Sequence, residues 1–326
     1  MYRLIALALA VLLAVAPATA QSPTLTIYTY DAFAAECGPG PQLKAGFEKT
    51  CNCTVSFVAT DSSIGALRRA QLEGATTSAD IILGLDTSVA GEARGTGLFE
   101  AHGLHFPRTV IPWTDPDFTP VDQGYFAFVY DKRKVPNPPA SFEALIAMPE
   151  SFQIVLEDPR SDTPGLGLVL WIKAAYGDRS PEIWKGLKPH IVTMARGWSD
   201  AYSLFLKGEA DMVLSYTTSP AYHAIAESDP NYGAAIFSEG HYPQTEIAGI
   251  LKISPNKELA THFLSWLVSP EAQAMIATTN WMYPITLGTD LPDAFGTPPD
   301  KVLSLDEATI TANKSAWIDE ALAAIR

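Results

Sequence analysis

The sequence has few cysteines, few basic residues and no long hydrophobic run after its first twenty residues. Only three cysteines occur among 326 residues. Lys and Arg number 22 against 36 Asp and Glu, which gives a formal net charge of −14. Because nucleic-acid binding depends on clusters of Lys and Arg, we expect no nucleic-acid partner. A membrane-spanning helix needs about 20 apolar residues, and no later segment supplies them.

Sequence motifs of common enzymes are also absent. The chain contains no G-x-S-x-G, H-E-x-x-H or P-loop motif, and no G-x-G-x-x-G opens a helix after a strand. Its six histidines are scattered, and the pair His102 and His105 lacks a nearby third ligand. We therefore expect no catalytic residues, no metal site and no resident cofactor, and we favour a binding protein over an enzyme.

The first twenty residues have the pattern of a signal peptide. Met1-Tyr2-Arg3 provides a basic start, and an unbroken apolar run extends from Leu4 to Ala16. Pro17 then ends the run, and Ala18-Thr19-Ala20 matches the small-x-small pattern of a cleavage site. We predict cleavage after Ala20 and an exported, soluble mature protein.

The three cysteines, Cys37, Cys51 and Cys53, are odd in number, so pairing two of them leaves one thiol over. An oxidising compartment permits a disulfide. We expect the Cys51-Asn52-Cys53 spacing to be too tight for an unstrained bridge. The sequence therefore leaves the pairing open.

The mature length, residues 21–326, suits two domains of roughly 150 residues each. Apolar strand-like runs alternate with helical patterns, which predicts an α/β fold. We expect strands at 25–30, 54–59, 80–85, 124–130, 152–156, 210–215 and 247–253. The predicted lobe 1 comprises 21–123 plus 247–326, and lobe 2 comprises 124–246. Two chain crossings between the lobes form a hinge, and a ligand cleft lies between them.

Hydroxyl-rich turns follow three of the predicted strands. They are Asp61-Ser62-Ser63, Ser161 to Pro164 and Ser215 to Tyr222. Such strand-to-helix turns present backbone N–H groups and hydroxyls, which suit a phosphate. Each turn alone is as well explained by ordinary helix capping. Tyr and Trp side chains near loops can also stack on a flat cationic heterocycle.

Several strings of the mature chain are specific enough to compare with a known family. They include YTYDAF (28–33), GPGP (38–41), ADIILGLD (79–86), GYFAFVYDK (124–132), EDPRSDTPGLGL (157–168), LSYTTSPAYH (214–223) and NWMYP (280–284). These strings resemble the periplasmic thiamine-binding proteins of bacterial ABC transporters. The resemblance implies a type II periplasmic-binding fold with two α/β lobes. It also implies a periplasmic monomer that binds thiamine, thiamine monophosphate and thiamine pyrophosphate. This monomer would deliver them to an inner-membrane ABC permease.

The resemblance also implies which residues bind the ligand. Carried over by motif, they are Tyr30, Ser62, Ser63, Asp162, Thr163, Trp198, Tyr216, Thr217, Thr218, Ser219, Tyr222 and Trp281. We expect Tyr222 and Trp281 to flank the rings. Ser62, Ser63, Thr163, Trp198 and the 216–219 turn would hold the phosphate end or its waters.

Two positions depart from the family pattern. The family has tryptophan before GPG, where this chain has Cys37, and an Asp-Gly pair where this chain has Asp61-Ser62-Ser63. Cys37 raises one alternative function, a thiaminase-like enzyme with a cysteine nucleophile, for which Glu36 is the only base nearby in sequence. Binding of a different cationic solute, ferric ion or a polyamine, is a third function to weigh. The sequence has no Tyr-Tyr pair for ferric ion, and a polyamine site needs more carboxylates facing the cleft.

Overall fold

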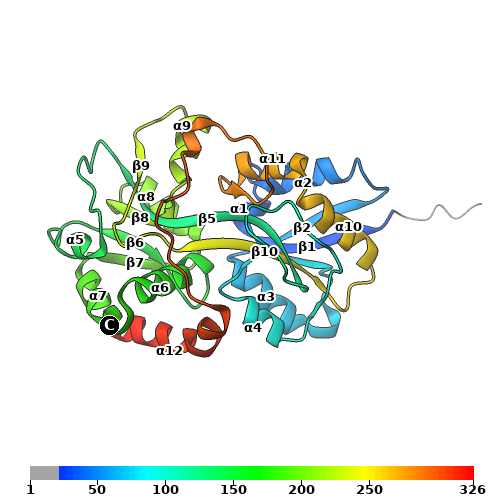
Figure 1. Cartoon of the computed structure of the whole chain (residues 1–326), viewed down its shortest axis with the longest axis horizontal. Helices are drawn as coiled ribbons and strands as arrows, with labels where there is room; N and C mark the ends of the chain where they lie inside the picture. The colour runs from blue at the N-terminus through cyan, green and yellow to red at the C-terminus, as the bar shows by residue number, and fades with distance from the viewer. Residues whose placement is uncertain (1–21) are drawn as a thin grey trace, which may run out of the picture.

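The computed structural model describes residues 22–326, so the predicted signal peptide and its cleavage site lie outside the described part. The chain forms two α/β halves that lie side by side and are linked by long central strands (Figure 1). The predicted two-lobed α/β architecture is confirmed. Within residues 22–326, no helix is long and apolar enough to cross a bilayer.

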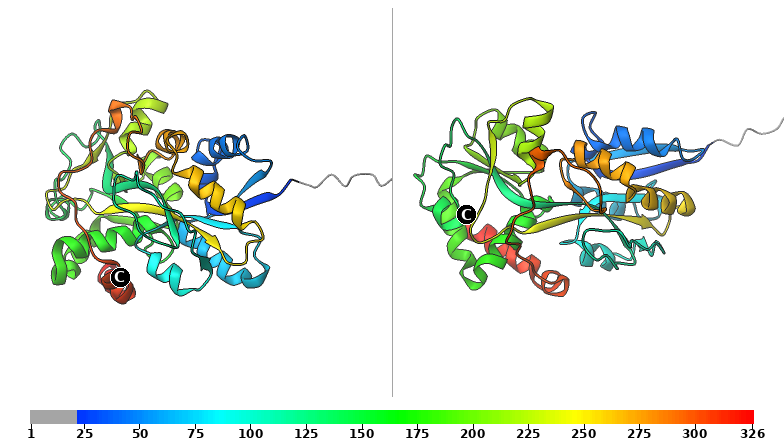
Figure 2. Two further views of the ribbon diagram at one scale, coloured as in Figure 1. Left: turned by 45° about the vertical axis from the view of Figure 1, so that its right-hand side comes forward. Right: turned by 45° about the horizontal axis from the view of Figure 1, so that its top comes forward.

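The first half is built around parallel strands with helices on both sides (Figure 2). Its N-terminal elements are β1 (Thr24–Tyr30), α1 (Asp31–Ala34), α2 (Pro39–Phe47), β2 (Thr54–Thr60), α3 (Ser63–Glu73), β3 (Ile81–Asp86), α4 (Ala90–Gly95) and β4 (Phe99–Glu100). The chain returns later to add β10 (Pro243–Leu251), α10 (Lys257–Leu267), α11 (Pro270–Thr279) and β11 (Tyr283–Pro284).

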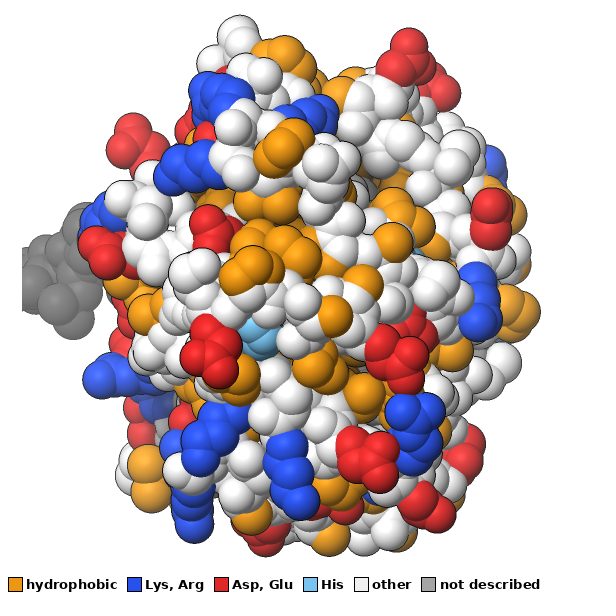
Figure 3. Space-filling model, turned by 90° about the vertical axis from the view of Figure 1, so that its left-hand side faces the viewer, with side chains coloured by type: hydrophobic (Ala, Val, Ile, Leu, Met, Phe, Trp, Pro, Cys, Tyr) orange, Lys and Arg blue, Asp and Glu red, His pale blue; other side chains and the backbone are white. Residues whose placement is uncertain are grey.

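The second half repeats the alternation of strands and helices. Its elements are α5 (Phe142–Ile146), β6 (Ile154–Glu157), α6 (Thr163–Tyr176), α7 (Ser180–Leu187), β7 (Ile191–Ala195), α8 (Trp198–Leu206), β8 (Met212–Tyr216), α9 (Ser219–Ala226) and β9 (Tyr232–Ala235). On the face of this half shown in Figure 3, Lys and Arg side chains are interspersed with Asp and Glu.

The sheet order is β2-β1-β3-β10-β5-β8-β6-β7, where β5 spans Phe118–Asp131. Strand β1 pairs in parallel with β2 and β3, and β6 pairs in parallel with β7 and β8. Strand β10 is antiparallel to both β3 and β5. The parallel strands therefore form two groups, one in each half, with the antiparallel β5 and β10 between them.

Strand β5 carries the chain from one half to the other. Its residues up to Tyr125 pair with β10, and those from Phe126 onward pair with β8 and β9. The last helix, α12 (Glu307–Ile325), packs mainly against α6 and α7 and also touches α4. The predicted lobe boundaries assign all residues after 247 to lobe 1. These boundaries stay a prediction. Helix α12, which they assign to lobe 1, packs mainly against helices of the second half.

Close packing explains the glycines of the Thr163–Leu168 string. All six residues of β3 and most of α6 are buried, as their apolar sequences require. A Cβ at Gly165 would lie 2.4 Å from the Glu157 carbonyl oxygen, and one at Gly167 would lie 2.0 Å from the Phe126 ring. The two glycines let the first turn of α6 approach β5 and β6, which fixes the start of α6 beside the strand ends.

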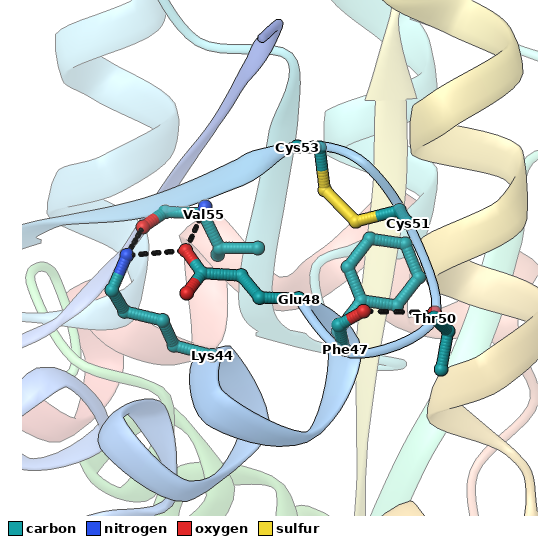
Figure 4. Close-up of a disulfide and its surroundings, with 7 residues drawn as sticks. All are labelled: Lys44, Phe47, Glu48, Thr50, Cys51, Cys53 and Val55. Carbon is teal, nitrogen blue, oxygen red and sulfur yellow. Dashed lines mark hydrogen bonds and ion pairs between the residues drawn. A yellow bond between two sulfur atoms is a disulfide. The ribbon is translucent and has the colours of Figure 1, made fainter.

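The disulfide joins Cys51 to Cys53 (Figure 4). This differs from the expectation that the spacing is too tight. The two residues lie in a bend between α2 and β2, which brings their Cα atoms to 5.3 Å, within the range that disulfides span. Cys37 is the free cysteine, and it is exposed.

Candidate functional site

A cavity of about 530 Å³ lies between the two halves. Nine of the twelve predicted residues line it, namely Tyr30, Ser63, Asp162, Thr163, Trp198, Tyr216, Ser219, Tyr222 and Trp281. Ser62, Thr217 and Thr218 do not. The Ser62 hydroxyl caps α3 by accepting a hydrogen bond from the Gly65 N–H, and Thr218 is buried beside the start of α9. The structure thus brings most of the predicted residues together; their role in binding stays a prediction.

Four helices begin at the cavity, and the first residue of each lines it. These residues are Ser63 of α3, Thr163 of α6, Trp198 of α8 and Ser219 of α9, called here the helix-start cluster. Each helix follows the carboxyl end of a parallel strand. The first turn of a helix has free N–H groups and the positive end of the helix dipole. Four such ends around one cavity make a favourable environment for an anion.

Hydrogen bonds connect the residues of the helix-start cluster, and one of them joins the two halves. The hydroxyls of Ser63 and Thr163 lie 3.1 Å apart, which links α3 of the first half to α6 of the second. The Trp198 indole N–H donates to the Ser215 hydroxyl at 2.9 Å, and that hydroxyl lies 2.8 Å from the Ser219 hydroxyl. These bonds hold the polar groups in fixed positions around the cavity.

The aromatic residues Tyr222 and Trp281 form a pair on the cavity wall. Their ring centroids are 5.5 Å apart with an interplanar angle of 71°. Trp281 has a φ of 58°, a left-handed conformation that costs a non-glycine residue about 1–2 kcal/mol. Its ring stacks on Phe295, with a centroid distance of 6.1 Å. Backbone strain of this kind is typical of functional positions, where surrounding structure enforces it.

A group of acidic residues at the cavity was not found from the sequence. Glu246 and Asn280 line the cavity beside Tyr30, and Asp122 lies behind Asn280. The Tyr30 hydroxyl lies 2.9 Å from Glu246 Oε1 and 3.1 Å from Asn280 Oδ1. The Asn280 side-chain amide donates to Asp122 at 2.7 Å. Tyr30, Asp122, Glu246 and Asn280 are called here the acidic cluster. Glu246 directly precedes the strand predicted at 247–253, and a carboxylate next to a buried strand was the sequence signal for the cluster.

Burial controls the pKa values of these carboxyl groups. Removal from water raises the pKa of Glu246 well above its ordinary value, and the nearby Asp122 raises it further. Burial likewise raises the pKa of Asp122, although the hydrogen bond from Asn280 opposes this. At the start of α6, burial raises the pKa of Asp162 to about 7, against the lowering effect of the Trp198 and Thr163 N–H groups.

Cys37 also lines the cavity, close to Tyr222. Burial, the hydrogen bond to Glu227 and charge on Glu227 and Cys37 all raise the pKa of Tyr222. The resemblance leads us to expect a tryptophan at this position, where this chain has a cysteine, which has no ring. The aromatic rings at the cavity therefore come from other residues, among them Tyr222 and Trp281.

Polar contacts at the exposed rim of the cavity also join the two halves. Arg196, before α8, forms an ion pair of 2.6 Å with Asp61, before α3. Ser199 donates a hydrogen bond of 3.1 Å to Asp31. A Cβ at Gly197 would lie 2.5 Å from the Asp61 carbonyl oxygen, so glycine permits this close approach. The structure therefore represents a closed arrangement of the halves.

The chain matches the family model described as bacterial extracellular solute-binding protein over residues 22–274. The thiamine-binding periplasmic protein of Escherichia coli (strain K12) is 48% identical over 313 residues, 95% of each chain. A solved periplasmic thiamin binding protein has a TM-score of 0.90 and 47% identity, covering 94% of this chain and 97% of the other.

A ferric binding protein from Campylobacter jejuni has a TM-score of 0.75 at 20% identity, covering 92% of this chain and 99% of the other. That likeness shows the fold alone. With the first three matches it confirms the predicted type II periplasmic-binding fold. The chain belongs to the bacterial extracellular solute-binding proteins, in the same family as the thiamine-binding periplasmic proteins that it matches over almost its whole length.

Proposed function

We propose that this chain is a periplasmic protein that binds thiamine, thiamine monophosphate and thiamine pyrophosphate in the cavity between its halves. As a monomer, it delivers them to an inner-membrane ABC permease. The ligand contacts both halves and so stabilises the closed arrangement, which is the form that the permease distinguishes. This mechanism requires the ligand to bind the closed form more tightly than the open one.

One observation carries the proposal: the cavity combines groups for a cationic aromatic ring with groups for an anion. Tyr222 and Trp281 offer aromatic faces, and Glu246 offers a carboxyl group, both suited to a thiazolium cation. The helix-start cluster offers N–H groups and hydroxyls suited to phosphate oxygens. Thiamine phosphates contain both kinds of group in one molecule. The names of the relatives support the same ligand.

A polyamine as the ligand gains one supporting observation. Asp162, which the sequence predicted, and Glu246, which it did not, both line the cavity and supply carboxylates. A polyamine, however, makes no use of four helix N-termini, whose dipoles repel a cation. The case for ferric ion rests on similarity to a ferric binding protein at 20% identity. Similarity at that level is evidence for the fold but not for the ligand. Thiamine therefore remains the better proposal.

We further propose that the ligand leaves the protein unchanged. The relatives are named as binding proteins, which supports a role without catalysis. A thiaminase-like enzyme would use the Cys37 thiolate as a nucleophile, and it predicts cleaved thiamine. Cys37→Ser would then abolish the cleavage.

The test is calorimetric titration of refolded, ligand-free protein with thiamine, its monophosphate, its pyrophosphate and spermidine. Mass analysis of each ligand follows the titration. Tight one-to-one binding of intact thiamine compounds, with no heat from spermidine, is the expected result. Absence of heat and of thermal stabilisation with all three thiamine compounds would refute the ligand assignment. Cleaved thiamine would instead establish the enzyme.

A further inference from the structure

With the Asn280 amide oriented as the structure places it, one arrangement of protons satisfies the hydrogen bonds of the acidic cluster. The single Tyr30 hydroxyl proton has three acceptors within reach, the two Glu246 oxygens at 2.9 and 3.2 Å and Asn280 Oδ1 at 3.1 Å. The Asn280 amide N–H₂ is already committed to Asp122 at 2.7 Å. The structure thus orients the amide with Nδ2 toward Asp122 and Oδ1 toward Tyr30.

An ionised Glu246 leaves this network incomplete. Tyr30 then donates to Glu246, and the Asn280 Oδ1 atom lies without a donor. If Glu246 is protonated, it donates to the Tyr30 oxygen and Tyr30 donates to Asn280. Gln244 Nε2 donates to Glu246 Oε1 at 3.4 Å, so the proton belongs on Oε2, which lies 3.2 Å from the Tyr30 oxygen. A proton on Glu246 therefore completes a chain that runs from Glu246 through Tyr30 and Asn280 to an ionised Asp122.

Burial also favours the protonated form of Glu246 energetically. Glu246 and Asp122 are 4% and 0% exposed, and one Asp122 oxygen has no hydrogen-bond partner among the described residues. Two ionised carboxylates this close and this buried repel each other strongly. A cation in the cavity would remove the repulsion, and the proton would then be free to leave.

We propose that the acidic cluster is a subsite for the cationic part of the ligand, and that binding of this cation displaces the proton from Glu246 to solvent. The inference rests on the proposed function, since it takes the thiazolium of thiamine as the cation. Charge balances in the exchange, because one positive charge enters the site as one proton leaves it.

Ionisable groups face Glu246 from several neighbouring elements. They are Tyr30 of β1, Asp86 of β3, Asp122 of β5, Asp162 at the start of α6 and Tyr216 of β8. The hydrogen bond from Tyr30 lowers the pKa of Glu246. The carboxylates among them all favour the protonated form of Glu246. Among the described residues that line the cavity, Lys207 is the only Lys or Arg. The charged groups nearest to Glu246 are thus carboxylates.

The test measures protons directly. Thiamine itself is titrated at several pH values between 6 and 8, in paired buffers with small and large enthalpies of ionisation. At these pH values the aminopyrimidine of the ligand is already deprotonated, and thiamine has no phosphate to titrate. The dependence of observed heat on buffer enthalpy gives the protons released per thiamine. We expect up to about one proton, with affinity rising up to about tenfold per pH unit where release is complete.

Variants assign the proton to its residue. Glu246→Gln should reduce proton release to near zero and flatten the pH profile. Tyr30→Phe should move the midpoint of the profile to higher pH, because a hydrogen bond stabilises the charged carboxylate more than the neutral acid. Glu157→Gln is the matched control. Glu157 is equally buried and its pKa is also raised by burial, but it does not line the cavity, so release should persist.

The outcomes separate this inference from the proposed function. Thiamine binding with the same enthalpy in every buffer would overturn the proton exchange and leave thiamine binding intact. Release that persists in Glu246→Gln would overturn the assignment to the acidic cluster. No binding in any buffer refutes the proposed function itself. If Glu246→Gln does not fold, the wild-type buffer series and the direction of the Tyr30→Phe shift decide the question.

Discussion

The helix-start cluster and the acidic cluster contribute to one cavity but are constructed differently. The helix-start cluster uses hydroxyls and backbone N–H groups, each placed by a local strand-to-helix turn. The acidic cluster uses side chains from β1, β5, β10 and the residue after α11, joined by long-range hydrogen bonds. One cluster suits an anion and the other a cation.

This difference suggests that the two parts of the cavity have different roles in ligand binding. All three thiamine compounds have the same rings, and they differ only in their phosphates. The acidic cluster and the adjoining aromatic pair, which share the loop at Asn280 and Trp281, should therefore set a common affinity. The helix-start cluster should set the preference among the phosphate esters. Substitutions at single residues test this division of roles.

The largest effect is expected at Trp281. Trp281→Ala removes one ring of the aromatic pair and should weaken binding of all three ligands equally, by about 10- to 30-fold, as loss of a cation–π contact of about 1.5–2 kcal/mol implies. Trp281→Gly should lose the same affinity. Because Trp281 has a φ of 58°, the glycine variant should also be more stable than the alanine variant by about 1 kcal/mol.

Calorimetry and denaturant unfolding test the two parts of this prediction. Equal losses for the three ligands are the decisive feature. If thiamine pyrophosphate lost far more affinity than thiamine, Trp281 would belong to the phosphate part of the site and the proposed division would fail.

The second prediction concerns ester preference. Thr163→Val keeps the shape of the side chain but removes the hydroxyl that faces Ser63. Thiamine monophosphate and pyrophosphate should lose about tenfold in affinity, since a hydrogen bond to a charged group contributes about 1.5 kcal/mol. Thiamine should change less than about twofold. Thr218→Val is the control, because Thr218 is buried without lining the cavity and should leave the preference unchanged.

A reversal of those two results would have a clear meaning. If Thr218→Val changed the ester preference and Thr163→Val did not, the motif-based assignment of Thr218 would stand. The cavity geometry would then be the poorer guide to the phosphate contacts.

The two clusters also differ in how far the sequence revealed them. Ser63, Thr163 and Ser219 stand in short strings in which a strand, a hydroxyl turn and a helix follow one another, so local pattern was enough to place them. Tyr30 and Asn280, by contrast, are 250 positions apart and meet only because β1, β5 and β10 share one sheet. No local pattern encodes that contact.

The details that the sequence did not predict have similar causes. Thr217 and Thr218 belong to the same hydroxyl run as Ser219, yet successive residues of a turn point in different directions, and only some reach the cavity. The Cys51–Cys53 bridge depends on the path of a bend, which the spacing of the cysteines does not determine. The alternation of strands and helices, in contrast, predicted the α/β fold well because burial sets each element's pattern.

The third prediction uses pH to separate the clusters. Burial raises the pKa of Asp162 to about 7, so below this pH the neutral acid can donate a hydrogen bond to a phosphate oxygen. Above it, the carboxylate repels the phosphate. The affinity ratio of thiamine monophosphate to thiamine should therefore fall about three- to tenfold between pH 6.5 and 8.

Because both ligands have the same rings, the ratio of their affinities cancels any effect of pH on binding of the rings. Asp162→Asn should flatten the ratio, since an amide donates at every pH. A ratio that falls equally in the Asn variant would assign the effect to another group.

The smallest effect is expected at the exposed rim. Arg196→Ala removes the ion pair with Asp61 that joins the halves, and both side chains are mostly exposed, at 72% and 70%. Exposed pairs contribute little and are screened by salt. Affinity for all three ligands should therefore fall by less than about fivefold at low salt, and the difference from wild type should disappear near 0.5 M salt. A loss that is large, salt-independent or confined to the esters would place the rim within the phosphate part of the site. The helix-start cluster would then extend to Arg196, and the division between the two clusters would need to be redrawn.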